Sequence, residues 1–304
     1  MDIWRTGIVC LSLAEVLARG GIDGLPIRWL PQPSKKFSFL ADPFGLERDG
    51  KLHVFVEALD YRDRRGRIEV FSFDKELDLV GHGVCLSEPW HLSYPFVFEA
   101  EGDIYMLPEA YRSGGLTLYR ATDFPRRWEA VSRIKLPEMA VDATPMFHGG
   151  KWWIFCSPVG RKKDELHVVY ADRLEGPWTS HRSNPVRRGN DGSRPGGTPI
   201  LIDGSVVLPV QDCSTTYGEA ARALRFNQLT TDKVSFELGD PIRPPPSLAP
   251  FDAGLHTLSA CGPFTLLDVK RIDRSFKGSV IGRIGKVRRA VAGFHRPWRG
   301  TTPG

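Results

Sequence analysis

Acidic side chains in this sequence of 304 residues recur at matching places around glycine turns. Asp42 and Asp142 each lie eight residues before a turn glycine, where an apolar stretch begins. Glu57 and Glu109 each lie where the second apolar stretch of such a pair ends. If these carboxylates meet, their like charges raise the pKa of at least one of them, so that one acid stays protonated while another works as a base or nucleophile. Cleavage of a glycosidic bond requires such a pair of acids.

A hairpin pattern that occurs five times must position these acids. In its first copy, residues 39–57, two apolar runs flank an Asp-Gly turn, which is the strongest short-range signal for a β-hairpin. The turn glycines are 52, 48, 54 and 58 residues apart, at Gly50, Gly102, Gly150, Gly204 and Gly262. Such a period, built of hairpins, is typical of a β-propeller, in which each unit buries its sheet faces only against its neighbours. The sequence therefore predicts an all-β fold, a five-bladed β-propeller.

The predicted propeller spans residues 1–274 as one domain. Its blades are expected at residues 37–79, 84–122, 128–178, 194–238 and 252–273. A short strand at residues 4–9 is expected to complete the last blade and close the ring. The hairpin rhythm stops after Arg274, and residues 275–304 are expected to form a basic amphipathic tail.

Further polar residues are expected at one mouth of the propeller channel. The innermost strand of each blade lines this channel, and the first residues of these strands converge on one mouth. The second strands return to the same mouth and bring additional polar groups to it. The expected substrate-binding residues are Glu57, Tyr94, Arg194, Gln211, Asp212, Tyr217 and His256.

Asp42 and Asp142 also have an architectural interpretation, because an aspartate at the start of a strand often caps backbone N–H groups. A purely architectural aspartate should recur in every blade. The equivalent positions of the other blades hold Tyr94, Gly196 and His256. We therefore favour a functional role for the two aspartates.

Charge and cysteine content narrow the class of protein. The net charge is +5, but residues 270–304 contain ten Lys or Arg and one acid, so the rest of the chain is slightly acidic. A nucleic-acid-binding protein would place its positive charge on the folded face, so no nucleic-acid partner is expected. The five cysteines have neither disulfide nor zinc spacing, which indicates reduced thiols, no metal site and a cytoplasmic protein. No secretory signal and no run of transmembrane length is evident.

The apolar residues of segment 279–294 follow a helical period. They recur at steps of three and four residues, with basic residues mostly opposite, at Val280, Ile284, Val287, Val291 and Phe294. Two interpretations stay open. The helix packs on the side of the propeller, or it binds an anionic membrane surface or a partner enzyme. The second interpretation would place the protein at the periphery of a membrane.

The stretch Ala41-Asp-Pro-Phe44, followed by a hairpin, resembles the first blade of glycoside hydrolase family 43 and of the related families 32 and 68. The resemblance implies that Asp42 is the base or nucleophile and that Asp142 orients it or stabilises the transition state. Those families carry their general-acid Glu in a later blade than the second. Here either Glu109 in blade two or Asp212 in blade four would be the acid, or the site no longer hydrolyses anything.

Longer motifs resemble the propeller that forms the N-terminal domain of plant glucosamine inositolphosphorylceramide transferases and its bacterial homologues. They span almost the whole chain, at residues 94–99, 118–125, 194–197, 211–218 and 254–257. In the plant proteins the transferase chemistry is assigned to a separate domain. The resemblance therefore implies the fold more directly than it implies an activity.

Three hypotheses about function follow. The first is a carbohydrate-active enzyme of the glycosidase type, with Asp42 as base or nucleophile, Glu109 as acid and Asp142 as the orienting carboxylate. The alternatives are a glycosyltransferase or phosphorylase of polysaccharide or glycolipid biosynthesis, and a glycan-binding propeller without catalysis. Each expects a carbohydrate or glycoconjugate ligand. No cofactor is expected to be required, although the family 43 resemblance allows a structural Ca²⁺ near His256.

Overall fold

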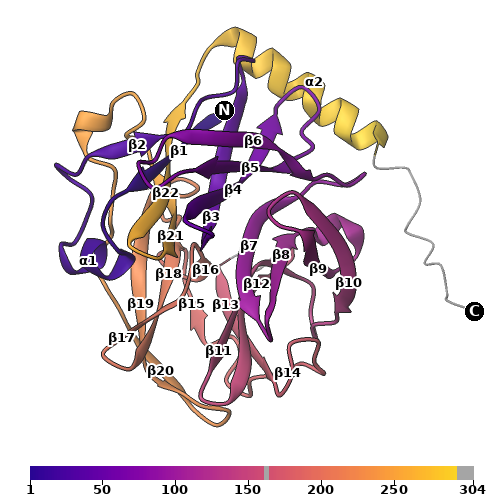
Figure 1. The fold of residues 1–304 in the computed structure, drawn as a ribbon, viewed down its shortest axis with the longest axis vertical. Helices are drawn as coiled ribbons and strands as arrows, with labels where there is room; N and C mark the ends of the chain where they lie inside the picture. Colours follow the sequence, from indigo (N-terminus) through magenta and orange to yellow (C-terminus); the bar gives the residue numbers. More distant parts are fainter. Residues whose placement is uncertain (161–163, 293–304) are drawn as a thin grey trace, which may run out of the picture.

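The computed structural model describes residues 1–160 and 164–292, which fold into a five-bladed β-propeller (Figure 1). Blade one consists of β3 (Ser38–Arg48), β4 (Lys51–Asp60), β5 (Arg67–Phe73) and β6 (Leu79–Leu86). Blade two consists of β7 (Ser93–Ala100), β8 (Asp103–Glu109), β9 (Leu116–Asp123) and β10 (Arg127–Ile134). Blade three consists of β11 (Ala140–His148), β12 (Lys151–Pro158), β13 (Glu165–Ala171), β14 (Thr179–Ser180) and β15 (Arg187–Arg188). Blade four consists of β16 (Arg194–Pro195), β17 (Ile200–Ile202), β18 (Ser205–Asp212), β19 (Ala220–Leu229) and β20 (Val234–Leu238).

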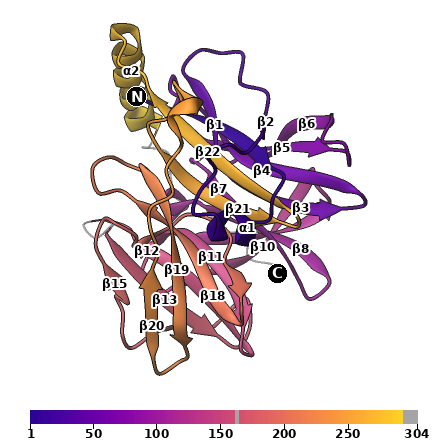
Figure 2. The same cartoon turned by 90° about the vertical axis from the view of Figure 1, so that its left-hand side faces the viewer.

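Blade five joins the two ends of the propeller in one sheet. Its inner strands are β21 (Leu255–Cys261) and β22 (Phe264–Ile272), and its outer strands are β1 (Asp2–Val9) and β2 (Ile27–Trp29). β1 lies antiparallel to β22 (Figure 2), with a register that runs from Asp2 opposite Ile272 to Val9 opposite Thr265. The ring is thus closed by hydrogen bonds between segments more than 250 residues apart.

The predicted blade limits at residues 79, 84, 122 and 128 are wrong. β6 extends blade one to Leu86, and β10 belongs to blade two and extends it to Ile134. Both are outermost strands, and most of their side chains are exposed or only partly buried. A strand that packs so little side-chain surface lacks the apolar alternation from which the blades were predicted.

Each pair of neighbouring blades encloses its own apolar core. β4 shows how one strand serves two cores, because alternate side chains point to opposite faces of a sheet. Phe55 packs with Phe96 between blades one and two. Val54, its neighbour in sequence, packs with Ile8 and Leu266 between blades five and one. Blades bury their faces against both neighbours all round the ring, so the ring must close to be stable.

In residues 1–160 and 164–292, two α-helices lie outside the blades. α1 (Leu13–Ala18) begins at Ser12, which forms a capping box with Glu15. α2 (Phe276–Ala292) follows β22 and runs along the outside of the propeller (Figure 1). It begins three residues before the predicted start, and Phe294 lies outside the described residues. Within the described part of the chain, neither helix combines the length and apolar character needed to cross a bilayer.

Ile8→Ala is expected to lower the free energy of unfolding by about 2–5 kcal/mol, because it leaves a cavity in a core. Ile8 is fully buried in the closing strand, between blades five and one. Urea denaturation measures the change. Leu201→Ala, exposed in blade four, is the matched control, with an expected change within about 0.5 kcal/mol. Equal, small effects of both substitutions would show that β1 does not stabilise the ring.

Candidate active site

The inner strands of four blades carry an irregularity at the same place. The strand register shifts between Ala41 and Phe44 in β3, and at the equivalent places in β7, β11 and β21. Asp42, Tyr94 and Asp142 lie within these bulges with φ angles of 51°, 47° and 52°. Such left-handed backbone costs about 1–3 kcal/mol for a residue other than glycine and persists only where its surroundings hold it. Bulges redirect side chains, and here they set the directions of the residues that were predicted to converge.

A cavity of about 490 Å³ opens at the end of the ring where these bulges lie. Its volume lies within the range of roughly 300–1,000 Å³ that small-ligand sites occupy. Of the residues that the structure describes, four carboxylates line it, together with one arginine and several hydrogen-bonding groups: Asp42, Glu57, Glu109, Asp142, Arg194, Tyr217, His91, Ser93 and Tyr111. Six residues predicted for the site, the three catalytic candidates among them, therefore share one cavity.

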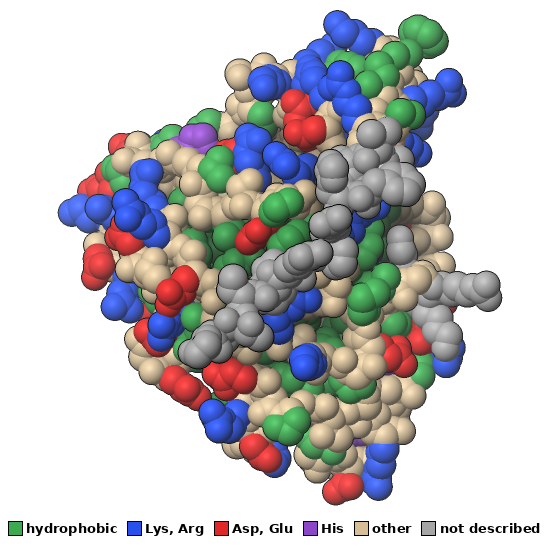
Figure 3. Space-filling model, turned by 90° about the vertical axis from the view of Figure 1, so that its right-hand side faces the viewer, with side chains coloured by type: hydrophobic (Ala, Val, Ile, Leu, Met, Phe, Trp, Pro, Cys, Tyr) green, Lys and Arg blue, Asp and Glu red, His purple; other side chains and the backbone are tan. Residues whose placement is uncertain are grey.

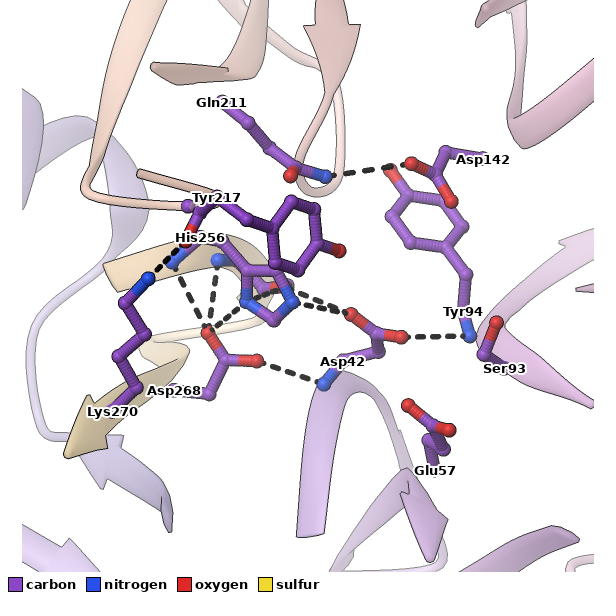
Figure 4. Close-up of polar contacts among 12 residues, drawn as sticks. Asp42, Glu57, Ser93, Tyr94, Asp142, Gln211, Tyr217, His256, Asp268 and Lys270 are labelled. Atoms are coloured by element: carbon purple, nitrogen blue, oxygen red, sulfur yellow. Dashed lines mark hydrogen bonds and ion pairs between the residues drawn. The ribbon is translucent and has the colours of Figure 1, made fainter. Parts of the chain in front are cut away.

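Asp42 is held by the blades on both sides of its own (Figure 4). Its carboxylate Oδ2 accepts the backbone N–H of Tyr94 at 3.1 Å, and its own N–H donates to Oδ2 of Asp268 at 2.8 Å. Nε2 of His256 lies 3.2 Å from its Oδ1. Burial raises the pKa of Asp42 to about 6, and the charges of Asp268 and Asp142 act in the same direction, while His256 opposes them. Asp42 is thus an acid at the cavity wall that ionises close to neutral pH.

His256 connects Asp42 to a second buried carboxylate behind the cavity. Its Nδ1 lies 2.7 Å from Oδ1 of Asp268, and its ring stacks on Trp4 of β1 at a centroid distance of 3.8 Å. Burial alone lowers the pKa of His256, but the charges of Asp268 and Asp42 outweigh it and raise the pKa above its ordinary value. Asp268 also accepts the backbone N–H of Thr257 at 3.0 Å. The imidazole therefore lies between two carboxylates, and both favour its protonated form.

The resemblance to family 43 allows a structural Ca²⁺ at these same groups. Among the described residues, Asp42, His256 and Asp268 have ligand atoms within 4.8 Å of one another. Ca²⁺ takes about six to eight oxygen ligands. Here the cluster offers two carboxylates and one imidazole, and the two ring nitrogens of His256 already face the carboxylates. This donor set does not fit Ca²⁺.

Asp142 forms an ion pair with Arg194 beside the cavity. Nε of Arg194 donates to Oδ2 of Asp142, and Nε2 of Gln211 lies 3.4 Å from the same oxygen. Burial lowers the pKa of Arg194, but the charge of Asp142, its hydrogen bond to Arg194 and the contributions of Tyr217 and Cys213 together outweigh burial and raise the pKa well above its ordinary value. The guanidinium also lies over the ring of Tyr217, 5.3 Å from its centroid. Asp142 therefore has a permanent cation as its partner.

Glu109 forms no ion pair among the described residues, although it is buried in the same cavity. Its Oε2 accepts the hydroxyl of Ser93 and its Oε1 the N–H of Tyr111, both at 3.3 Å. Burial raises the pKa of Glu109 to about 7. The charge of Asp142 acts in the same direction, while the two hydrogen bonds and the charge of Arg194 act against it. Glu109 is thus about half protonated at neutral pH and suited to donate a proton.

Four residues predicted to bind substrate do not line the cavity: Tyr94, Gln211, Asp212 and His256. Tyr94 is buried between blades, where its hydroxyl accepts the N–H of Gly197 at 3.0 Å and lies 2.9 Å from Oγ1 of Thr144. Gln211 and His256 lie behind the carboxylates that they contact.

Asp212, the rival candidate for the general acid, is bound to its own blade. Its Oδ2 accepts from Nε of Arg222 at 2.8 Å, and its Oδ1 accepts the N–H of Ser214 at 3.0 Å. Burial raises the pKa of Asp212, but these hydrogen bonds outweigh it and leave the pKa below its ordinary value. A carboxyl with this pKa, away from the cavity, is a poor proton donor to a ligand there.

Several residues of the site were not among the predicted ones. Asp268 lies within the second strand of its blade, as Glu57 does, and this equivalence is the signal that could have found it. His91 lies in a connection between blades, where Nδ1 accepts the N–H of Gly66 at 2.9 Å. This bond leaves the ring proton on Nε2, 3.5 Å from Oε1 of Glu57.

Comparison with known proteins identifies the family. The family described as "Glucosamine inositolphosphorylceramide transferase 1, N-terminal" matches residues 30–239. The chain belongs to this family. It is 36% identical over 203 residues to glucosamine inositolphosphorylceramide transferase 1 of Oryza sativa subsp. japonica, and likewise to that of Arabidopsis thaliana. The match covers 64% of this chain but 27% and 26% of those proteins, so the chain spans about a quarter of their length.

Solved structures share the fold at low sequence identity. A family 117 glycoside hydrolase of the marine bacterium Zobellia galactanivorans is 14% identical, with a TM-score of 0.57 over 79% of this chain and 88% of that one. The catalytic domain of the Coprinopsis cinerea GH62 α-L-arabinofuranosidase is 12% identical, with a TM-score of 0.53 over 79% and 93%. The predicted five-bladed propeller and the predicted family are both confirmed.

Glu109→Gln is expected to gain stability relative to the wild type as the pH rises. The folded-state pKa of Glu109, about 7, lies above its ordinary value of 4.5. Between these values the folded protein holds a proton that the unfolded chain has released, so the free energy of unfolding of the wild type falls as the pH rises. The full effect is at most about 3 kcal/mol.

Urea denaturation of both proteins at several pH values between 4.5 and 8 measures this change. Glu99→Gln, at an exposed position in β7, is the control, and it should show no comparable gain. A stability difference between Glu109→Gln and the wild type that is the same at every pH would contradict the raised pKa.

Proposed function

We propose that this chain is a carbohydrate-active enzyme of the glycosidase type, and that its cavity binds a sugar. The observation that carries the proposal is the pair of acids in one cavity, Glu109 and Asp42, whose pKa values lie at about 7 and about 6. Two titratable groups with separated pKa values take different roles as acid and base.

Glu109 is the proposed proton donor to the departing glycosidic oxygen. Ser93 and Tyr111 hold its carboxyl group at the cavity wall, and its burial and the charge of Asp142 favour the protonated form. Asp42, which is largely ionised at neutral pH, is the proposed base or nucleophile. Asp142 and Arg194 form a fixed dipole beside them that orients the sugar.

The charge of the cavity favours one class of sugar. Among the described residues, four carboxylates and one arginine line it, so an anionic uronate or phosphate would meet mainly like charge from these residues. A neutral sugar or an amino sugar avoids this repulsion. The name of the plant relatives contains glucosamine, and a glucosamine-containing glycoconjugate is the substrate that we propose to test first.

Glu109→Gln and Asp42→Asn are each expected to reduce turnover of an aryl glycoside by about 10²–10⁴-fold, because each removes a proton-transfer or nucleophilic group. A panel of aryl glycosides that includes glucosaminides tests this, with sugar affinity measured in parallel by calorimetry. Glu99→Gln, which leaves the cavity untouched, is the control and should keep full turnover. Turnover that survives in both cavity variants would refute the assigned roles.

A glycan-binding role, in support of a transferase, is the second candidate. Two observations favour it. Both carboxylate oxygens of Asp42 already contact protein groups, the N–H of Tyr94 and Nε2 of His256. The chain also spans only about a quarter of the length of the plant transferases. If the wild type and Asp42→Asn both bind sugar but neither turns over any glycoside of the panel, the glycosidase role is rejected and the glycan-binding role remains.

A further inference from the structure

The apolar side chains of α2 face away from the propeller. Phe276 is 85% exposed and Val287 is 64% exposed, and Val280 and Ile284 are exposed as well. With 3.6 residues per turn, these four positions fall within an arc of about 80° on one side of the helix. A helix that merely covers a core would turn this side inward.

The opposite side of α2, which packs on the propeller, is made of glycine. Gly278, Gly282 and Gly285 are buried in this contact. A Cβ atom at Gly285 would collide with the carbonyl oxygen of Tyr61, and one at Gly282 would lie 3.2 Å from Sδ of Met1. The close approach of the helix backbone thus fixes which side of α2 meets the propeller and which side is left outward.

Basic residues flank the outward apolar side. Arg283 and Lys286 fall on one flank, and Lys277 and Arg288 fall on the other. The sequence from residue 276 to 304 contains no Asp or Glu. Figure 3 shows the Lys and Arg side chains gathered with apolar ones at the end of the molecule where α2 lies. The surface therefore combines an apolar stripe with a cationic border.

We propose that α2 binds the surface of a membrane that contains anionic lipids. An apolar stripe of this kind lies at the boundary between headgroups and acyl chains, and flanking cations reach the phosphates. A second copy of the chain fits this surface less well, because it would bring the basic flanks of the two helices together. α2 itself is not long and apolar enough to cross the bilayer, so it lies along the surface.

The bound membrane would lie at the same end of the ring as the cavity. α2 follows β22 directly and packs on the loop between β4 and β5, at Tyr61 and Arg64. At the other end of this loop, Gly66 donates its N–H to His91 in the cavity wall. In combination with the proposed function, this placement would bring the headgroup of a glycolipid to the cavity mouth. The membrane binding itself does not depend on that function.

Flotation of the full chain with vesicles tests the proposal. We expect binding to vesicles of phosphatidylcholine and phosphatidylserine (7:3) and little binding to pure phosphatidylcholine. The double variant Phe276→Gln/Val287→Gln should bind the anionic vesicles more than about tenfold more weakly, since it removes two large apolar side chains from the stripe. Both positions are highly exposed, so the fold should be preserved, and an unchanged thermal unfolding transition checks this. The matched control, Phe147→Gln/Leu201→Gln, removes two exposed apolar side chains elsewhere and should bind like the wild type.

A charge variant and an oligomer measurement complete the test. Arg283→Gln/Lys286→Gln should weaken binding by roughly fivefold for each cation removed, and added salt should reduce this difference.

Equal vesicle binding by the stripe variant, Phe276→Gln/Val287→Gln, and its control, or no binding to anionic vesicles, would overturn the proposal. A concentration-dependent dimer in sedimentation that the stripe variant abolishes would also overturn it and assign the face to a second copy. Turnover of a water-soluble glycoside should be unaffected by all these variants, so a failure here is distinct from a failure of the proposed function.

Discussion

The strained backbone of Asp42 is the constraint on which the site depends. With φ at 51°, its N–H reaches Asp268 in blade five, while its carboxylate accepts the N–H of Tyr94 in blade two. One residue therefore connects three blades around the channel. The same carboxylate faces His256, whose ring stacks on Trp4 of the closing strand β1. The site is complete only when the ring is closed, so ring closure and site geometry depend on each other.

The buried carboxyl groups of the site differ in their charged partners, and this difference gives them different roles. Asp142 has Arg194 as a permanent cation, and Asp42 and Asp268 share the imidazole of His256, whose pKa they raise. Glu109 has two neutral hydrogen-bond donors and no cation of its own among the described residues. Its burial and the charge of Asp142 raise its pKa to about 7, above the value of about 6 for Asp42. The glycosidase interpretation rests on this difference between neighbouring carboxylates.

The sequence was sufficient to predict the inner hairpins, because Asp-Gly and similar turns separate buried strands at a regular period. It was not sufficient for β6 and β10, whose exposed side chains leave no apolar alternation.

Counting back from the turn glycines found Asp42 and Asp142, which occupy equivalent positions in their bulges. The count could not tell which side chains enter the cavity, because Tyr94 occupies the same place and turns its hydroxyl into a contact between blades. Asp212 was a plausible acid until its partner Arg222, from the paired strand, was known. In α2 the apolar period was evident, but the packing was set by the close approach of glycines, which a hydrophobic pattern does not report.

The most direct test is the titration of Glu109 itself in the full chain. Its side-chain carboxyl can be followed by ¹³C NMR and assigned by its loss in Glu109→Gln. We expect a midpoint near 7 in the wild type, and a lower midpoint in Asp142→Asn, since that variant removes a like charge and frees Arg194. A wild-type midpoint near the ordinary value of 4.5 would show that Glu109 is fully ionised at neutral pH, and it would contradict its role as the acid.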